Sequence, residues 1–173
     1  NGADAEQVYA AIRLANPGGL GEVASYNIAA APPADLIAAM SESAARDLVA
    51  RQYVNGFQEV FDATVPWIVD GCRRGWRLTK AIVHAQLRLM SDFPDSLIAR
   101  KCGVETARES ATRAGAVLAT VGSNQEDFWP AVSDLDFWLR ADGNRRNPGT
   151  TADFMAAGLF VALRDELIKP PFH

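Results

Sequence analysis

Apolar residues recur at intervals of three and four positions along most of this chain, while strict alternation of apolar and polar residues is hard to find. The first pattern is typical of amphipathic helices and the second of half-buried strands. The sequence therefore predicts an all-α fold, a compact multi-helix bundle of about seven to nine helices.

Proline, glycine and hydroxyl residues divide this pattern into segments. We expect helices over residues 3–15, 36–61, 66–69 and onward to Gly71 or Gly75, 79–90, 96–101, 104–121, 130–139 and 154–163. Asn55 and Gly56 mark a bend in the second segment, and Thr79 is suited to cap the fourth. The last segment is apolar on every side, which predicts that the C-terminal helix is buried at the centre of the bundle.

Size and composition favour a single helical domain over residues 1–173. Apolar residues make up 49% of the chain and charged residues 22%, an ordinary balance for a globular protein with a sizeable core. The net charge is −4, without a basic field, so we expect no nucleic-acid partner. The apolar run 154–163 is about half the roughly 20 residues that a bilayer-spanning helix needs, so we expect no membrane span.

Cys72 and Cys102 lack the spacing of a metal site and the density of a disulfide scaffold, so we interpret both as reduced thiols of a cytoplasmic protein. The chain starts at Asn1 without an initiator methionine or a signal sequence. This start suggests a fragment of a longer protein.

The segment 144–153 is the most informative for chemistry, because it places two arginines, a glycine and two hydroxyls before an apolar helix. A helix start offers unpaired backbone N–H groups and partial positive charge to a phosphate. The candidate phosphate ligands are Arg145, Arg146, Asn147, Gly149, Thr150 and Thr151. Alternatively, Thr150 caps the helix with Asp153 in a variant capping box. The residues leave both interpretations open.

A second segment, 92–101, sets a carboxylate before a short helical turn and two cations at its end. Asp95 could hold magnesium while Arg100 or Lys101 contacts phosphate oxygens. Alternatively, Asp95 or Ser96 caps the turn and the cations are solvated.

A third segment is glycine-rich and carries Gly18, Gly19 and the carboxylate of Glu22. It permits close approach of a ligand, although a tight interhelical turn explains it as well. His84 lies next to apolar neighbours in an amphipathic segment, so we interpret it as a structural residue. The aromatic pairs at 128–129 and 137–138 favour the core, with a partner surface or nucleobase stacking as the alternatives.

The three segments together resemble the triphosphoribosyl-dephospho-coenzyme A synthase family. The resemblance rests on Asn-Pro-Gly-Thr-Thr-Ala-Asp at 147–153, Pro-Asp-Ser-Leu-Ile-Ala-Arg at 94–100 and Gly-Gly-Leu-Gly-Glu at 18–22, in the family's order. Leu97 stands where the family typically has an asparagine, and the family's upstream Asn-Thr and glycine motif does not precede Val8. We therefore expect either the C-terminal part of a longer family member or a divergent branch.

The resemblance implies a reaction in which a ribose hydroxyl of dephospho-coenzyme A attacks the anomeric carbon of ATP, releasing adenine and preserving the triphosphate. A carboxylate could stabilise ribosyl charge or accept the attacking proton, and Asp153 and Asp95 are the candidates. Glu22 is a further carboxylate to test. Magnesium would sit at Asp95 and Asp153, and Arg100, Lys101, Arg145, Arg146, Thr150 and Gly149 would meet the triphosphate.

The leading hypothesis is thus a transferase of prosthetic-group or cofactor biosynthesis that uses ATP and a dephospho-CoA-like acceptor. A related transferase with another acceptor is the first alternative. The second is a non-catalytic helical binding module, in which this chain alone is inactive and needs a missing N-terminal half or a homo-oligomer. The enzyme hypotheses require the separate helix starts to meet around one polyphosphate-sized hollow.

Overall fold

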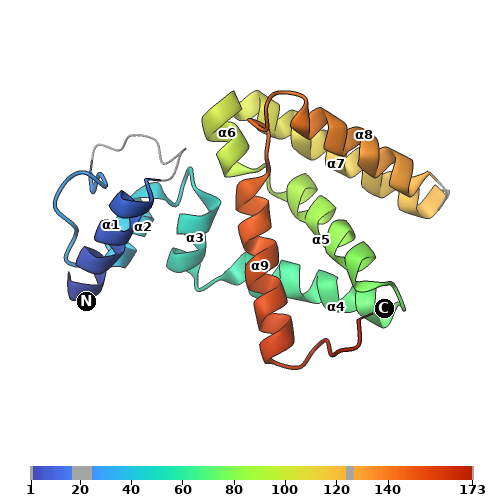
Figure 1. The fold of residues 1–173 in the computed structure, drawn as a ribbon, viewed down its shortest axis with the longest axis horizontal. Helices are drawn as coiled ribbons and strands as arrows, with labels where there is room; N and C mark the ends of the chain where they lie inside the picture. Colours follow the sequence, from blue (N-terminus) through green and yellow to red (C-terminus); the bar gives the residue numbers. More distant parts are fainter. Residues whose placement is uncertain (1, 17–24, 124–126, 173) are drawn as a thin grey trace. The chain divides into compact units, whose positions relative to one another are not determined.

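The computed structural model describes residues 2–16, 25–123 and 127–172, and every regular element in them is helical, which confirms the all-α class (Figure 1). By its contacts the chain divides into two compact units, Asn1–Phe57 and Gln58–His173. Each unit is described by itself. No helix among the described residues is both long and apolar enough to cross a bilayer.

The N-terminal unit contains α1 (Gly2–Ala15), α2 (Leu36–Ser43) and α3 (Leu48–Asn55). The helix expected over 36–61 is therefore wrong as one segment with a bend at Asn55 and Gly56. A further break separates Ser43, the end of α2, from Leu48, the start of α3. The break occurs where Asp47 accepts hydrogen bonds from the N–H groups of Val49 and Ala50, which starts a new helix. Gly56 then ends α3 in the left-handed conformation, as its position before a bend predicts.

The C-terminal unit contains the remaining elements. In chain order these are η1 (Val60–Thr64), a π-helical turn, α4 (Val65–Arg73), α5 (Leu78–Asp92), α6 (Ser96–Cys102), α7 (Val104–Ser123), α8 (Phe128–Arg140) and α9 (Gly149–Arg164). Helix α5 contacts α4, α7 and α9, and α8 lies along α7 (Figure 1). The short α6 contacts both α7 and α9, so it joins two parts of the unit that are distant in sequence.

A core cluster of this unit lies between α5, α7 and α8. Its buried members are Leu87, Met90, Ala114, Val117, Phe128 and Leu135. They recur at helical spacing, and burying such side chains removes apolar surface from water at about 25 cal/mol per Å². This packing fixes α8, and with it the start of the loop that leads into α9.

Helix α9 crosses η1 closely, and a glycine allows the approach. A Cβ atom at Gly158 would overlap Cγ2 of Thr64, a side chain that is fully buried. The Thr64 hydroxyl donates to the carbonyl of Glu59 five positions earlier, within the wide π-helical turn.

Helix α9 buries one face, which includes Phe154, Met155 and Gly158. Its other face remains in water, since Phe160 is 62% exposed and Leu163 is 46% exposed. The expectation of burial on every side is therefore wrong for these positions. An apolar helix at the edge of a small unit has too few neighbours to cover its whole circumference.

Two expected helix starts are also wrong in detail. Helix α5 begins at Leu78 without a side-chain cap, so Thr79 is not its cap, and α8 begins at Phe128, two residues before Pro130. Proline is compatible with a first helical turn, where its missing N–H would have no partner in the helix. Pro130 therefore indicates the first turn of α8 but not its first residue.

Candidate functional site

A single carboxylate, that of Asp95, caps two helices. Its Oδ1 atom accepts hydrogen bonds from the N–H groups of Leu97 at 2.9 Å and Ile98 at 3.1 Å, at the start of α6. Its Oδ2 atom accepts from the N–H of Thr151 at 2.8 Å and from the Thr151 hydroxyl at 2.9 Å, at the start of α9. Asp95 is 1% exposed, so these four bonds take the place of water around the carboxylate.

Of the two interpretations left open for segment 144–153, the one in which Thr150 caps the last helix is wrong. Helix α9 begins at Gly149 after Pro148, which has no side chain able to cap, and Thr150 is buried within the first turn. The N–H of Thr151 would have no partner within its own helix, and Asp95 supplies the acceptor from α6. The alternative in which Asp95 caps its own short turn is confirmed as well.

A buried pair of hydroxyls lies beside the carboxylate. Oγ of Ser96 and Oγ1 of Thr150 are 3.0 Å apart, and Nη1 of Arg100 is 3.5 Å from the same Ser96 oxygen. Gly149 contributes by having no side chain, because a Cβ there would lie 2.6 Å from Cδ2 of Leu97. The two segments that the sequence singled out, 94–100 and 147–153, are thus joined directly, and we call this joint the Asp95 junction.

Beyond the junction lies a polar hollow of about 620 Å³, within the range of small-molecule sites. We call it the polar hollow. Its lining comes from α5, α6, α8 and the loop before α9, and consists of Gln86, Lys101, Asp136, Leu139, Arg140, Gly143, Asn144, Asn147 and Pro148. Of the predicted ligands, Lys101 and Asn147 line it.

The hollow also contains polar side chains that the sequence analysis missed. Asp136 and Arg140 form an ion pair one helical turn apart, with Nε and Oδ1 2.8 Å from each other. Gln86 and Asn144 add amide groups. Asp136 and Arg140 are four residues apart and precede a loop that contains two asparagines. This spacing could have identified the pair from the sequence.

The predicted arginines of the loop differ in their contacts. Nη2 of Arg145 donates to the carbonyl of Lys101 at 2.9 Å, which ties the loop to the end of α6. The guanidinium of Arg146 stacks on the ring of Trp138 at 4.3 Å from its centroid, and that of Arg113 approaches the same ring at 4.6 Å. Arg145 therefore holds the rim of the polar hollow, while Arg146 anchors the loop to α8.

Asp153 is exposed on α9, two positions after Thr151. Residues two apart on an α-helix point about 200° apart around its axis, so Asp153 faces away from the side that meets Asp95. The structure does not bring these two carboxylates together as a pair of ligands. Among the described residues there is no group of three or more Asp, Glu, His or Cys side chains that could hold a metal ion.

Gly18, Gly19 and Glu22 lie outside the described residues, and their proposed roles stay predictions. The aromatic pairs have mixed environments: Phe128 is buried in the core, whereas Trp129 is 47% exposed and Phe137 is 75% exposed. Cys72 and Cys102 are free thiols, as expected.

His84 lies away from the junction and meets the edge of the Trp76 ring, with the ring centroids 4.9 Å apart. Burial lowers the pKa of His84, and the nearby charges of Arg88, Arg74 and Lys80 lower it further, while Asp70 acts in the opposite direction. The half-buried neutral ring fits the structural role that the sequence favoured.

Comparison with known proteins identifies a family. No curated protein and no solved structure matches the chain. The family model of ATP:dephospho-CoA triphosphoribosyl transferase matches residues 1–172, which is nearly all of the chain and includes both segments of the Asp95 junction. The chain therefore belongs to the ATP:dephospho-CoA triphosphoribosyl transferase family, as its motifs predicted.

Proposed function

We propose that this protein transfers a triphosphoribosyl group from ATP to a hydroxyl of dephospho-CoA, in the synthesis of a prosthetic group. The C–N bond between the ribose of ATP and adenine breaks, and a C–O bond to the acceptor hydroxyl forms at the same carbon. Adenine leaves with the bonding electron pair and takes up a proton, while the acceptor hydroxyl loses one. The triphosphate chain remains intact.

The observation that carries this proposal is the Asp95 junction beside the polar hollow. The junction holds the starts of α6 and α9 together through a carboxylate that is 1% exposed, so the elements around the hollow have fixed positions. Lys101, Arg140 and the amides of Asn144 and Asn147 line the hollow and are suited to bind phosphate oxygens. We infer that the triphosphate of ATP lies there.

Asp95 acts in this proposal as a positioning residue and not as a metal ligand. A carboxylate has about four lone-pair sites, and donors from α6 and α9 occupy all four of those on Asp95. The predicted role of Asp95 as a magnesium ligand and catalytic base therefore does not fit its contacts.

Asp153 is exposed but does not belong to the lining of the polar hollow, so it does not lie where we place the triphosphate. Magnesium commonly uses one or two protein carboxylates together with phosphate oxygens and water, and Asp136 is the carboxylate of the hollow that could hold it. When bound, the ion would neutralise charge on the triphosphate. Asp153, Glu22 and Asp136 are the carboxylates that could accept the proton of the acceptor hydroxyl, and Asp136 is the one that lines the polar hollow.

The free thiols Cys72 and Cys102 support a cytoplasmic location.

A second candidate keeps ATP and changes the acceptor. Leu97, which stands where the family typically has an asparagine, lies against Gly149 at the Asp95 junction. An apolar side chain there removes one polar contact from the neighbourhood of the site. Offering dephospho-CoA and other ribose-containing acceptors in parallel distinguishes the two candidates.

Calorimetric titration with ATP and magnesium tests the proposed site. We expect saturable binding by the full-length protein, and about tenfold weaker binding for K101Q and for R140Q, because each removes one cation from the polar hollow. R108Q is the matched control, since Arg108 forms an exposed ion pair with Glu105 outside the hollow. A folded protein that does not bind ATP, or that binds it equally well after K101Q and R140Q, would contradict the proposal.

A further inference from the structure

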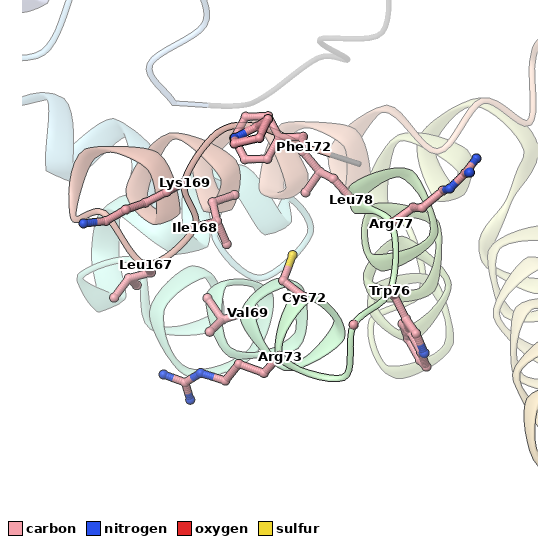
Figure 2. Close-up of a pocket in the computed structure, with 12 residues that line it drawn as sticks. Val69, Cys72, Arg73, Trp76, Arg77, Leu78, Leu167, Ile168, Lys169 and Phe172 are labelled. Carbon is pink, nitrogen blue, oxygen red and sulfur yellow. The ribbon is translucent and has the colours of Figure 1, made fainter.

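A second hollow, of about 440 Å³, opens at the other end of α9 (Figure 2). Its walls are the end of α4, the turn into α5 and the segment 167–172 that follows α9. It shares no lining residue with the polar hollow. The 16 residues of α9 span about 24 Å between the Asp95 junction and this wall, so the two hollows are separate.

The inner surface of this second hollow is apolar. Val69 and Ile168 are each 6% exposed, and Cys72, Leu78 and Phe172 complete the surface around them. In Figure 2 the Cys72 sulfur points toward the space between these side chains. A hydrocarbon group placed there would lose contact with water on several sides, which favours binding of an apolar body.

The rim of the hollow carries positive charge. Arg73, Arg77 and Lys169 belong to the lining, and no aspartate or glutamate is among the described residues that line it. Lys169 pairs with Glu166, whereas Arg73 and Arg77 make no ion pair or hydrogen bond with any of the described residues. Both side chains are exposed, and in Figure 2 they extend away from the hollow on different sides. Rotation about their side-chain bonds would bring either guanidinium toward a ligand at the rim.

Arg74 differs from Arg73 and Arg77, because it forms a local ion pair and they do not. Arg74 lies between them in sequence and binds Asp70 at 2.8 Å, with its guanidinium over the ring of Trp76. A basic residue in the last turn of α4 complements the helix dipole, which accounts for one cation at this end. It does not account for the second unpaired arginine, Arg77, beyond the helix.

We propose that this second hollow binds a small organic anion with an apolar body, such as an alkyl phosphate. The hydrocarbon part lies on Val69, Ile168 and Phe172, and the charged group meets Arg73 and Arg77 at the rim. An inorganic anion would gain nothing from the apolar surface, and a neutral hydrocarbon would gain nothing from the arginines. The site is independent of the proposed transfer reaction.

Calorimetry with octyl phosphate below its micelle concentration tests the proposal on the full-length protein. We expect octyl phosphate to bind at least about tenfold more tightly than inorganic phosphate or octanol, because only it uses both parts of the hollow. R73Q/R77Q should weaken it about tenfold, and F172S should weaken it by several-fold. R74Q is the matched control and should bind like the unsubstituted protein, as should K101Q, whose change lies in the polar hollow.

Cysteine alkylation provides a second readout that does not depend on a substitution. Cys72 lines the second hollow, whereas Cys102 ends α6 and does not line it. Octyl phosphate should slow alkylation of Cys72 by iodoacetamide, measured by peptide mass spectrometry, and leave Cys102 unchanged. Equal effects on both thiols, no protection of Cys72, or equal affinity of R73Q/R77Q and R74Q would each overturn the proposal.

Discussion

Oδ2 of Asp95 accepts hydrogen bonds from both the backbone N–H and the hydroxyl of Thr151, although the two residues are 56 positions apart in sequence. The same carboxylate caps α6 through its other oxygen. One buried side chain therefore satisfies the start of α6, whose Lys101 lines the polar hollow, and the start of α9, which follows the loop that lines it. The placement of segment 94–100 against segment 147–153 depends on this contact.

D95N should be strongly destabilising. An amide has one oxygen to accept hydrogen bonds, and its NH₂ group would face the N–H donors of α6 or α9. We expect a loss of about 2–4 kcal/mol in the free energy of unfolding, measured by urea denaturation. D134N, an exposed change on α8, is the matched control and should shift it by less than about 0.5 kcal/mol. A D95N protein as stable as D134N would show that the junction is not needed for the fold.

The hydroxyl pair of Ser96 and Thr150 should show energetic coupling. Each of S96A and T150V leaves one buried hydroxyl with fewer partners, whereas the double substitution removes both groups. We expect the double variant to be less destabilised than the sum of the single variants by about 0.5–1.5 kcal/mol. Strict additivity in a double-mutant cycle would argue that the 3.0 Å contact contributes nothing to stability.

G158A should destabilise the C-terminal unit by about 1–3 kcal/mol, because the new methyl group overlaps Cγ2 of Thr64. T64S removes that methyl group and keeps the hydroxyl. The double variant T64S/G158A should therefore recover part of the stability that G158A loses. If T64S gives no recovery, the close crossing of α9 and η1 is not the cause.

The lowered pKa of His84 predicts that the free energy of unfolding decreases at acid pH. Its pKa in the folded protein is lowered, first by burial and then by Arg88, Arg74 and Lys80, so the unfolded state binds a proton more readily. The stability contribution of the neutral ring is full above the unfolded pKa of about 6.5 and is lost as the pH falls below that value. We expect the drop in unfolding free energy between pH 7.5 and pH 5.5 to be smaller in H84Q. Equal drops in both proteins would exclude His84 as the cause.

The helical fold could be predicted because each helix carries its own apolar periodicity and its own breaks. Segments 92–101 and 144–153 could also be singled out from the sequence. Their signals, Asp95 before a helical turn and Gly149-Thr150-Thr151 before an apolar run, are local patterns. What Asp95 does could not be found in this way. A side chain placed before α6 has one evident helix to cap, and only the packing of α6 on α9 gives it a second.

The lining of the polar hollow was predicted in part for the same reason. Lys101 and Asn147 lie within the segments that carry the motifs, but Asp136 and Arg140 lie on α8 and reach the hollow through tertiary packing. Arg146 was expected at phosphate, and its guanidinium stacks on the half-buried ring of Trp138, a favourable tertiary contact that no local pattern reports. The expectation of a single domain stays a prediction.

The most direct test of the proposed reaction is release of free adenine from ATP. The full-length protein is incubated with ATP, magnesium and dephospho-CoA, and adenine and the triphosphoribosylated product are quantified by chromatography and mass spectrometry. We predict that adenine and product form in equal amounts, that neither forms without the acceptor, and that K101Q slows both. A folded protein that binds ATP but releases no adenine with dephospho-CoA or any other acceptor would contradict the assignment.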